Sequence, residues 1–330
     1  MTNVNAATQA SLRVNDPIIT QIVQGYVQAD GIAPFIAPVV PVSTRSGKVI
    51  TFGKEQFAVL NLSRAPGTNI QRLGTEFGTR SYFLEQDAIG AEVAEEQYQE
   101  AMNGAARLDI RKFAVTRAMV AATQSWENRV VSAITDATAY ETTNTAALVG
   151  TNKFSDPDSD PEQLVQDWQE AIRAQVGVYA NSAVMGPKVF NALRRHPLFR
   201  DRIKYTSSGS VNLEMIAAWF DLPRGVRVAK RVKLGANQEL VDMFGNDFLL
   251  FYSPEGDVGT GFRPLGYSDA ATPAFAYTYA LAQYPIGGVE RFDDDRRVYV
   301  SDVITEQSLQ MVGQGTTGKV GAAYLAKNCI

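Results

Sequence analysis

Residues 181–193 read NSAVMGPKVFNAL, and this stretch decides how the second half of the chain is arranged. Ser182 to Gly186 is a short apolar run of the kind that forms a buried strand. Pro187 follows directly, and proline is favoured in the first turn of a helix because the N–H it lacks would have no partner there. The sequence therefore predicts a buried strand that leads at once into a helix through Leu193.

Helices and strands alternate on both sides of this stretch. A helix is expected from Pro161 to about Gln175, with Asp160 as the N-cap that accepts hydrogen bonds from the first turn. Residues 211–220 predict another helix. Strands are expected at residues 226–229, 248–252, 275–281, 289–292 and 297–301. Helices and strands in this mixture favour an α+β protein.

The region from about Ala105 to Asp136 predicts one long amphipathic helix. Apolar and small residues recur there at three- and four-residue steps, with the arginines mostly off that stripe. At 3.6 residues per turn this makes roughly eight turns, more than twice the length of an average helix. A helix of this length is typical of an element that spans a whole domain.

The first 44 residues are poor in charge and rich in proline. Ile18, Ile22 and Tyr26 have helical spacing, so a short amphipathic helix is expected around them. The segment is too broken to form a domain and too apolar to stay solvated as a disordered tail. We therefore expect it to bind along its own domain or along a neighbouring subunit.

Residues 45–86 predict a long, open β-hairpin. Strand-like runs stand near both ends, and the stretch from Asn61 to Gly78 between them is rich in glycine. Loops longer than about 12–15 residues are usually functional when they are ordered. Charged residues along the hairpin could set the register between copies of the chain. These charged residues are Arg64, Arg72 and Arg80, with Glu76 and Glu85 as the acidic partners.

Composition excludes several classes of protein. The net charge of −4 argues against a surface built to neutralise many phosphates. With one cysteine, Cys329, no disulfide within the chain is expected. No apolar run reaches the roughly 18 residues of a membrane helix, and the N-terminus lacks the features of a secretion signal. The single histidine, His196, is expected at a helix C-terminus before a proline stop, where a cation suits the helix dipole.

Three motifs that could suggest chemistry lack the context they need. Gly313–Lys319 has the spacing of a phosphate loop, but Val320 stands where a hydroxyl should bind magnesium, and only ten residues remain for a helix and sheet. Gly256–Gly261 is not followed by a helix pattern. Asp293–Asp295 reads as an acidic turn. No catalytic, cofactor or metal site is therefore predicted.

The order of these parts resembles the HK97-like major capsid proteins of tailed, double-stranded DNA bacteriophages. The local likeness lies in the strand and helix of residues 181–193, in Ile216–Leu222, and in the strand at Val226–Lys230. The resemblance implies an N-terminal arm at 1–44, an E-loop hairpin at 45–86, and a peripheral domain with a spine helix at 87–145. It further implies a mixed α/β axial domain at 146–283, with return strands and tail at 284–330.

The resemblance also implies a structural role without catalysis. Copies of the chain would assemble as hexamers and pentamers into an icosahedral shell around the phage genome, formed in the cytoplasm of the host bacterium. The arm and hairpin would supply the contacts between subunits, through Ile18, Ile22, Tyr26, Lys54, Arg64, Arg72, Glu76 and Arg80.

The expected partners are further copies of the chain, a separate scaffolding protein, a portal, a decoration protein, and the packaged DNA through weak non-specific contacts. Covalent crosslinking through Lys54 is not favoured, because no asparagine partner or activating acid is identified. Three alternatives stay open: an encapsulin-like nanocompartment shell with an enclosed enzyme cargo, a nucleotide-binding enzyme using Gly313–Lys319, and a tail or fibre subunit.

Overall fold

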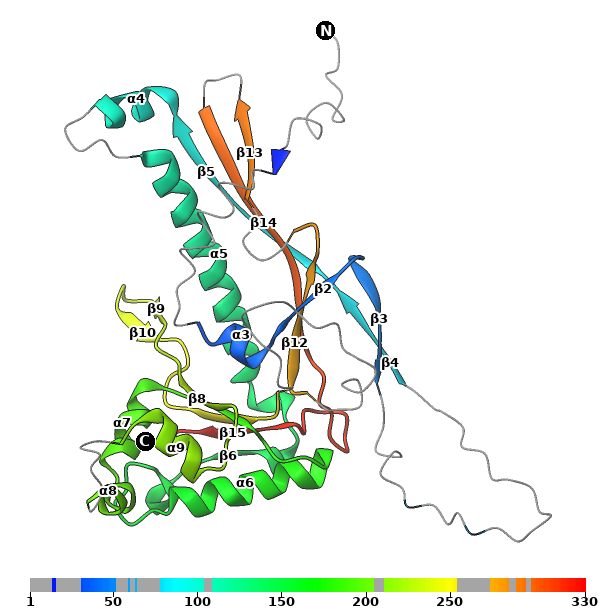
Figure 1. Cartoon of the computed structure of the whole chain (residues 1–330), viewed down its shortest axis with the longest axis vertical. Coiled ribbons are helices and arrows are strands. Elements are labelled where there is room, and N and C mark those ends of the chain that lie inside the picture. Colours follow the sequence, from blue (N-terminus) through cyan, green and yellow to red (C-terminus); the bar gives the residue numbers. More distant parts are fainter. Residues whose placement is uncertain are drawn as a thin grey trace.

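A computed structural model describes most of the chain (Figure 1). The described residues are 31–51, 59, 63, 78–103, 109–204, 211–253, 274–284, 289–294 and 298–330, with the backbone of 14–15.

The helices lie mainly in the middle of the chain. They are α3 (Ala33–Ile36), α4 (Glu95–Asn103), α5 (Ile110–Ile134), α6 (Pro161–Val176), α7 (Pro187–Arg195), α8 (Pro197–Ile203) and α9 (Leu213–Trp219), with short 3-10 turns at Ala137–Ala139, Thr142–Asn144 and Gly150–Asn152.

The strands occur along the whole chain. They are β1 (Val14–Asn15), β2 (Val39–Val42), β3 (Ser46–Thr51), β4 (Gly78–Phe83), β5 (Glu85–Ala94), β6 (Thr145–Ala147), β7 (Ser182–Met185), β8 (Gly225–Val228), β9 (Val232–Leu234), β10 (Leu240–Asp242), β11 (Phe248–Phe251), β12 (Ala276–Leu281), β13 (Val289–Asp294), β14 (Val298–Met311) and β15 (Ala323–Lys327).

The first sheet is built around the long strand β14. Its order is β1-β13-β14-β12-β2, and β5 pairs with β14 as well. Every pairing is antiparallel except β12 with β2. The helix α5 lies along this sheet (Figure 1). Val115 and Met119 of α5 pack there against Tyr299 and Val303 of β14. The sheet and helix thus form one layered half of the molecule.

The second sheet has the order β6-β15-β11-β7-β8 and is covered on both faces. Its strand β11 shows this directly, because all four of its residues are buried. Phe248 and Leu250 point into a core shared with α6, α7 and α9. Leu249 and Phe251 point into a core shared with α3 and the end of α5. A strand buried on both faces reads as a continuous apolar run.

Local signals explain why α6 begins and ends where it does. Asp160 accepts hydrogen bonds from the backbone N–H groups of Glu162 and Gln163, both at 3.1 Å. Pro161 occupies the first turn, and Gly177 ends the helix with φ of 80°, a left-handed conformation that glycine adopts without a steric penalty. The predicted strand at Ser182 and the helices beginning at Pro161 and Pro187 are likewise confirmed.

The chain crosses between the two sheets after β11 and again after β14. β12 pairs with β14 of the first sheet, although β11 before it belongs to the second sheet. β15 then pairs with β11 of the second sheet. The domain bounds at 146–283 and 284–330 stay predictions. The long helix was expected over 105–136, and α5 covers residues 110–134 of that range.

Candidate functional site

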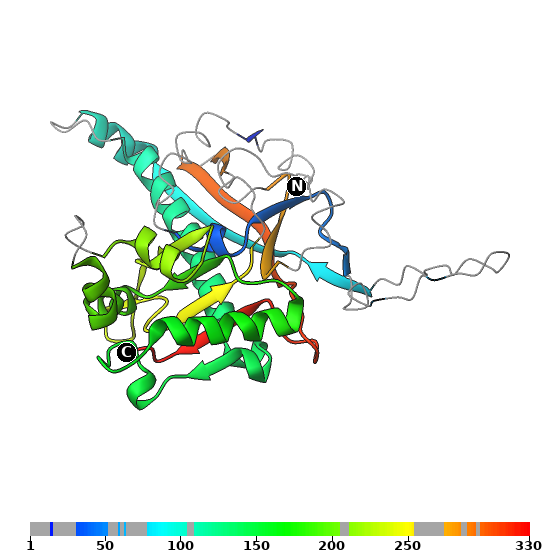
Figure 2. The ribbon, with the colours of Figure 1, turned by 60° about the horizontal axis from the view of Figure 1, so that its bottom comes forward.

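The β3–β4 hairpin lies on the side of the molecule away from α4 and the start of α5. Both views show this arrangement (Figures 1 and 2). The two strands pair antiparallel from Ser46 opposite Phe83 to Thr51 opposite Gly78. The stem of the predicted hairpin is thereby confirmed, while residues 52–58, 60–62 and 64–77 lie outside the described part.

Two arginines fasten the base of the hairpin to β14. Arg45 donates two hydrogen bonds to the carboxylate of Glu306, at 2.7 and 2.9 Å. The Glu306 side chain is only 4% exposed, whereas that of Arg45 is 69% exposed. Arg80 donates from Nη1 to the carbonyl oxygen of Met311 at 2.6 Å. A two-pronged pair fixes direction as well as distance, so these contacts set the angle at which the hairpin leaves the sheet.

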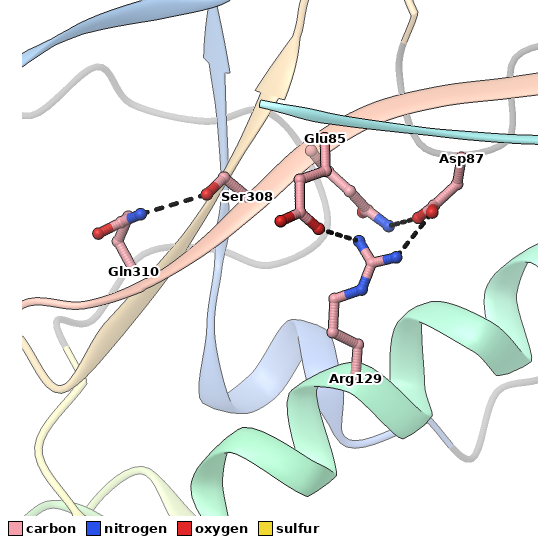
Figure 3. Close-up of polar contacts among 6 residues, drawn as sticks. Glu85, Asp87, Arg129, Ser308 and Gln310 are labelled. Atoms are coloured by element: carbon pink, nitrogen blue, oxygen red, sulfur yellow. Dashed lines mark hydrogen bonds and ion pairs between the residues drawn. The ribbon is translucent and has the colours of Figure 1, made fainter. Parts of the chain in front are cut away.

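Arg129 of α5 binds the strand that continues from the hairpin (Figure 3). Its Nη2 lies 2.6 Å from Asp87 Oδ1, and its Nη1 lies 3.8 Å from Glu85 Oε2. Gln307 of β14 donates to the other oxygen of Asp87 at 3.4 Å. The start of β5 is therefore held between the long helix and β14, directly after β4 ends.

A buried carboxylate fixes the root of the N-terminal segment. Glu127 of α5 is 1% exposed and accepts hydrogen bonds from the backbone N–H groups of Ile32 at 2.7 Å and Ala33 at 3.2 Å. These groups open α3, whose first N–H groups have no partner within the helix. Phe35 lies under the guanidinium groups of Arg224 and Arg227, 4.5 and 4.6 Å from the ring centroid. The described part of the arm is thus tied to both halves of the body.

Exposed apolar side chains gather at the β9–β10 hairpin and at the base of β4. Leu240 is 74% and Leu234 65% exposed on the former, and Phe83 is 68% exposed on the latter. A groove of about 630 Å³ separates β9–β10 from α5.

The phosphate-loop spacing at Gly313–Lys319 forms a closed turn. Thr317 donates from its backbone N–H and its hydroxyl to the Glu141 carboxylate, at 2.7 and 2.6 Å. Burial by itself raises the pKa of Glu141, but the hydrogen bonds from Thr317 and the Lys319 backbone outweigh it and lower the pKa. A carboxylate therefore stands where a phosphate would have to bind. The segment after the turn is strand β15 and not the helix that follows a phosphate loop.

His196 occupies the expected position between α7 and Pro197, and its side chain is buried. Its Nε2 lies 3.0 Å from the carbonyl oxygen of Asp156 and 3.1 Å from Ser159 Oγ. The ring therefore connects the loop before α6 to the α7–α8 corner.

Most of the predicted contact residues lie outside the described part of the chain. Arg80 is described, and its side chain is engaged within the chain by Met311. The others are Ile18, Ile22, Tyr26, Lys54, Arg64, Arg72 and Glu76. Sequence reasoning missed Glu306, Glu127 and Arg129, which hold the roots of the hairpin and the arm. Glu306 stands between Thr305 and Gln307, so its polar neighbours in the sequence gave no signal that it is buried.

A family model and a known phage protein both match this chain. The model of the family described as "Phage major capsid protein E" matches residues 97–230. The major capsid protein of Burkholderia phage BcepMu is 27% identical over 278 residues, which cover 84% of this chain and 87% of that protein.

Solved structures match almost the whole chain. A phage-related protein from Bordetella bronchiseptica RB50 is 26% identical with a TM-score of 0.72, covering 96% of this chain and 98% of that one. The chain has the HK97-like fold of phage major capsid proteins. A virus-like particle from Pyrococcus furiosus shares this capsid fold, with a TM-score of 0.54 and 10% identity, covering 95% of this chain and 100% of that one.

Two of the elements described above have established names in the HK97-like fold. The β3–β4 hairpin is the stem of the E-loop, and α5 is the spine helix. Together, the comparisons support a structural role in a capsid shell. Among the described residues, no helix is long and apolar enough to span a membrane.

Proposed function

We propose that this chain is the major capsid protein of a tailed bacteriophage and assembles as hexamers and pentamers into an icosahedral shell around double-stranded DNA. The observation that carries the proposal is the match to a phage-related protein over 96% of the chain at a TM-score of 0.72. The relative from phage BcepMu, a major capsid protein, supports it over 84% of the chain.

The contacts that fix the bases of the E-loop and of the N-terminal arm support assembly through these two projecting segments. Arg45, Arg80 and Arg129 fix the base of the hairpin to the first sheet and the spine helix. Glu127 fixes the root of the arm. A projecting segment with a fixed base loses little freedom when it docks, so more of its contact energy remains as binding energy. Projecting segments of this kind can therefore build large interfaces of about 2,000–5,000 Å², the size that is typical of obligate assemblies.

The proposed role is structural and involves no catalysis. Within the described ranges, no three His, Cys, Asp or Glu side chains stand close enough to hold a metal ion. The turn at Gly313–Lys319 supports the same reading, because Glu141 takes up the Thr317 N–H that a phosphate loop would offer to its ligand. We further propose that the first sheet is the core of the peripheral domain and the second sheet that of the axial domain.

The proposed partners follow from the same role. Copies of the chain are the main partner, in the virion capsid and during assembly in the host cytoplasm. A scaffolding protein, a portal, a decoration protein and the packaged DNA complete the set. The net charge of −4 supports weak contact with DNA, since a shell that bound phosphates strongly would oppose packaging and ejection.

Sedimentation velocity and negative-stain electron microscopy of the purified chain test the proposal. The expected result is closed shells of uniform size, or rings of five and six subunits that convert to shells when phage lysate is added. A monomer or a small dihedral oligomer under all conditions would overturn it. Shells that copurify with a bacterial enzyme and no DNA would instead identify a nanocompartment.

A further inference from the structure

Helices α7 and α8 carry a strongly basic surface in an otherwise acidic chain. Residues 187–204 hold six basic side chains and one acidic one, Asp201, although the net charge of the chain is −4. All six basic residues are exposed. They are Lys188, Arg194, Arg195, Arg200, Arg202 and Lys204. This surface is named the basic corner below.

Most of the basic corner has no opposite charge beside it in the described part of the chain. Arg202 pairs with Glu162 at 2.5 Å, and Lys204 lies 3.8 Å from Asp201. Lys188, Arg194, Arg195 and Arg200 have no ion pair among the described residues. Helix-dipole stabilisation accounts for the arginines in the last turns of α7 and α8, but a cation in the first turn of a helix is unfavourable. Lys188 stands in the first turn of α7, so local helix energetics do not explain its place in the cluster.

The loop before α6 and the exposed face of α6 form an acidic surface. Residues 155–170 contain six acidic side chains and no lysine or arginine. Glu162 pairs with Arg202, and Glu170 pairs with Arg173 at 3.1 Å. The other four have no cationic partner in the described part of the chain. They are Asp156, Asp158, Asp160 and Asp167. This surface is named the acidic strip below.

The two surfaces adjoin at one end of the molecule. The Arg202–Glu162 pair joins them, and His196 of the α7–α8 corner contacts Asp156 of the acidic strip. Both surfaces lie at the end of the molecule farthest from α4 and β13 (Figure 1), where Arg202 of α8 meets Glu162 in the first turn of α6. Among the residues that the structure describes, each subunit therefore presents four cations and four carboxylates without an ion pair at the same end.

We propose that the basic corner of one subunit binds the acidic strip of a second copy of this chain, and that this contact closes the ring of a capsomer. The inference rests on the proposed function, since it concerns rings of the shell subunit. A contact between two different surfaces of identical subunits is heterologous, and such a contact generates a ring when its rotation closes. Opposite charges across the contact steer the approach and set the register.

Charge complementarity favours a second copy over a nucleic acid as the partner. The numbers of unpaired cations and unpaired carboxylates match, so every charge can be matched around a closed ring. A DNA duplex that reached the basic corner would bring its phosphates close to the acidic strip beside it. Like charges in such proximity weaken binding.

Charge reversal tests the contact. Lys188→Glu with Arg195→Glu reverses part of the basic corner, and their spacing of seven residues places both on one face of α7. Asp158→Lys with Asp167→Lys reverses part of the acidic strip and spares the cap residue Asp160. Each double variant should raise the protein concentration needed for half-assembly by about tenfold or more. One chain that carries all four reversals should assemble with the wild-type concentration dependence.

Mixing the two double variants gives a sharper result. In a mixed ring, complementary contacts require the two variants to alternate, which an even-numbered ring allows and an odd-numbered ring does not. An equimolar mixture should therefore form hexamers but few pentamers, and few closed shells, by negative-stain microscopy and native mass spectrometry. The four-reversal chain should form both rings, because all of its subunits are alike.

Conservative variants serve as matched controls. Lys188→Arg with Arg195→Lys, and Asp158→Glu with Asp167→Glu, keep every charge and should assemble like the wild type. Circular dichroism of each variant checks that the subunit is folded. If the wild type forms shells and both reversal variants do so equally well, the inference is overturned while the proposed function stands.

Two further outcomes would also overturn the inference. If the reversal variants assemble normally but bind double-stranded DNA less tightly in low salt, the basic corner contacts a polyanion. If the wild type forms no ring or shell at all, the proposed function fails first, and the inference fails with it.

Discussion

The ring of Tyr82 stacks on the ring of Tyr279, with centroids 5.1 Å apart and planes inclined by 17°. Tyr82 belongs to β4 of the E-loop stem, and Tyr279 belongs to β12 of the first sheet. Both rings are buried, at 7% and 4% exposed. The stack therefore joins the projecting hairpin to the body through apolar area, in addition to the polar contacts of Arg45 and Arg80.

Replacing Tyr82 by alanine should loosen this joint. Loss of the buried ring and of the stack should lower the free energy of unfolding by about 2–4 kcal/mol, measured by urea denaturation of the unassembled subunit. Tyr82→Phe is the control, because it keeps the ring and loses only the hydroxyl contact with Thr44 at 3.2 Å, a change of less than about 1.5 kcal/mol. Equal stability of the two variants would contradict the role of the stack.

Glu127→Ala should release the root of the arm. The substitution leaves the buried N–H groups of Ile32 and Ala33 without their acceptor, and an unsatisfied buried donor costs about 1–3 kcal/mol. Urea unfolding should show a loss in that range or above it, and limited proteolysis should cut the first 40 residues faster. Glu127→Gln keeps one acceptor oxygen and should lose less. A wild-type proteolysis pattern for Glu127→Ala would argue that the arm is held elsewhere.

The parts of the fold that could be predicted are those whose signals are local. Asp160 and Pro161 mark the start of α6 with two adjacent residues, so the helix was found from sequence. Glu127 gave no such signal, because its partner Ile32 lies 95 residues away. The pairing of β15 with β11 gave no local signal either, since a long segment separates the two strands in the sequence.

The predicted contact residues show where sequence reasoning stops. Charge on a hairpin indicates an exposed segment, but it does not say which charges are used within the chain. Arg80 was expected to face a neighbour, and it donates to Met311 of its own chain. The contact between subunits stays a prediction for all of these residues, Arg80 included, because a partner surface has no signature in a single sequence.

Gly186→Ala should disrupt the second sheet. A Cβ at this position would lie 1.9 Å from the carbonyl oxygen of Gly245, a backbone atom that cannot move aside cheaply. The cost should reach or exceed the about 1–3 kcal/mol typical of overpacking, seen as a lower Tm and a lower yield of folded protein. Gly90→Ala is the matched control, since its Cβ would meet only the end of the flexible Asp302 side chain. A wild-type Tm for Gly186→Ala would contradict the close approach.

Burial raises the pKa of the Cys329 thiol, which is 0% exposed and donates to the carbonyl oxygen of Ala326 at 3.4 Å. A raised pKa in the folded state stabilises the protein fully below the pKa of the unfolded thiol, about 8.5, and progressively less above it. The free energy of unfolding should therefore fall by about 2 kcal/mol between pH 8 and pH 10 through this group alone. Cys329→Ala removes that contribution and provides the reference for urea unfolding at both pH values.

Thiol labelling gives an independent check on the same residue. The thiolate is the reactive form, and a buried thiol with a raised pKa holds almost none of it. A disulfide reagent such as dithionitrobenzoate should label Cys329 only at the rate of unfolding, and fully once urea is added. Subunits should also form no disulfide with one another under air oxidation. Complete labelling of the folded protein within minutes at pH 8 would show that the end of the chain opens readily, and the pH dependence of stability should then be weak.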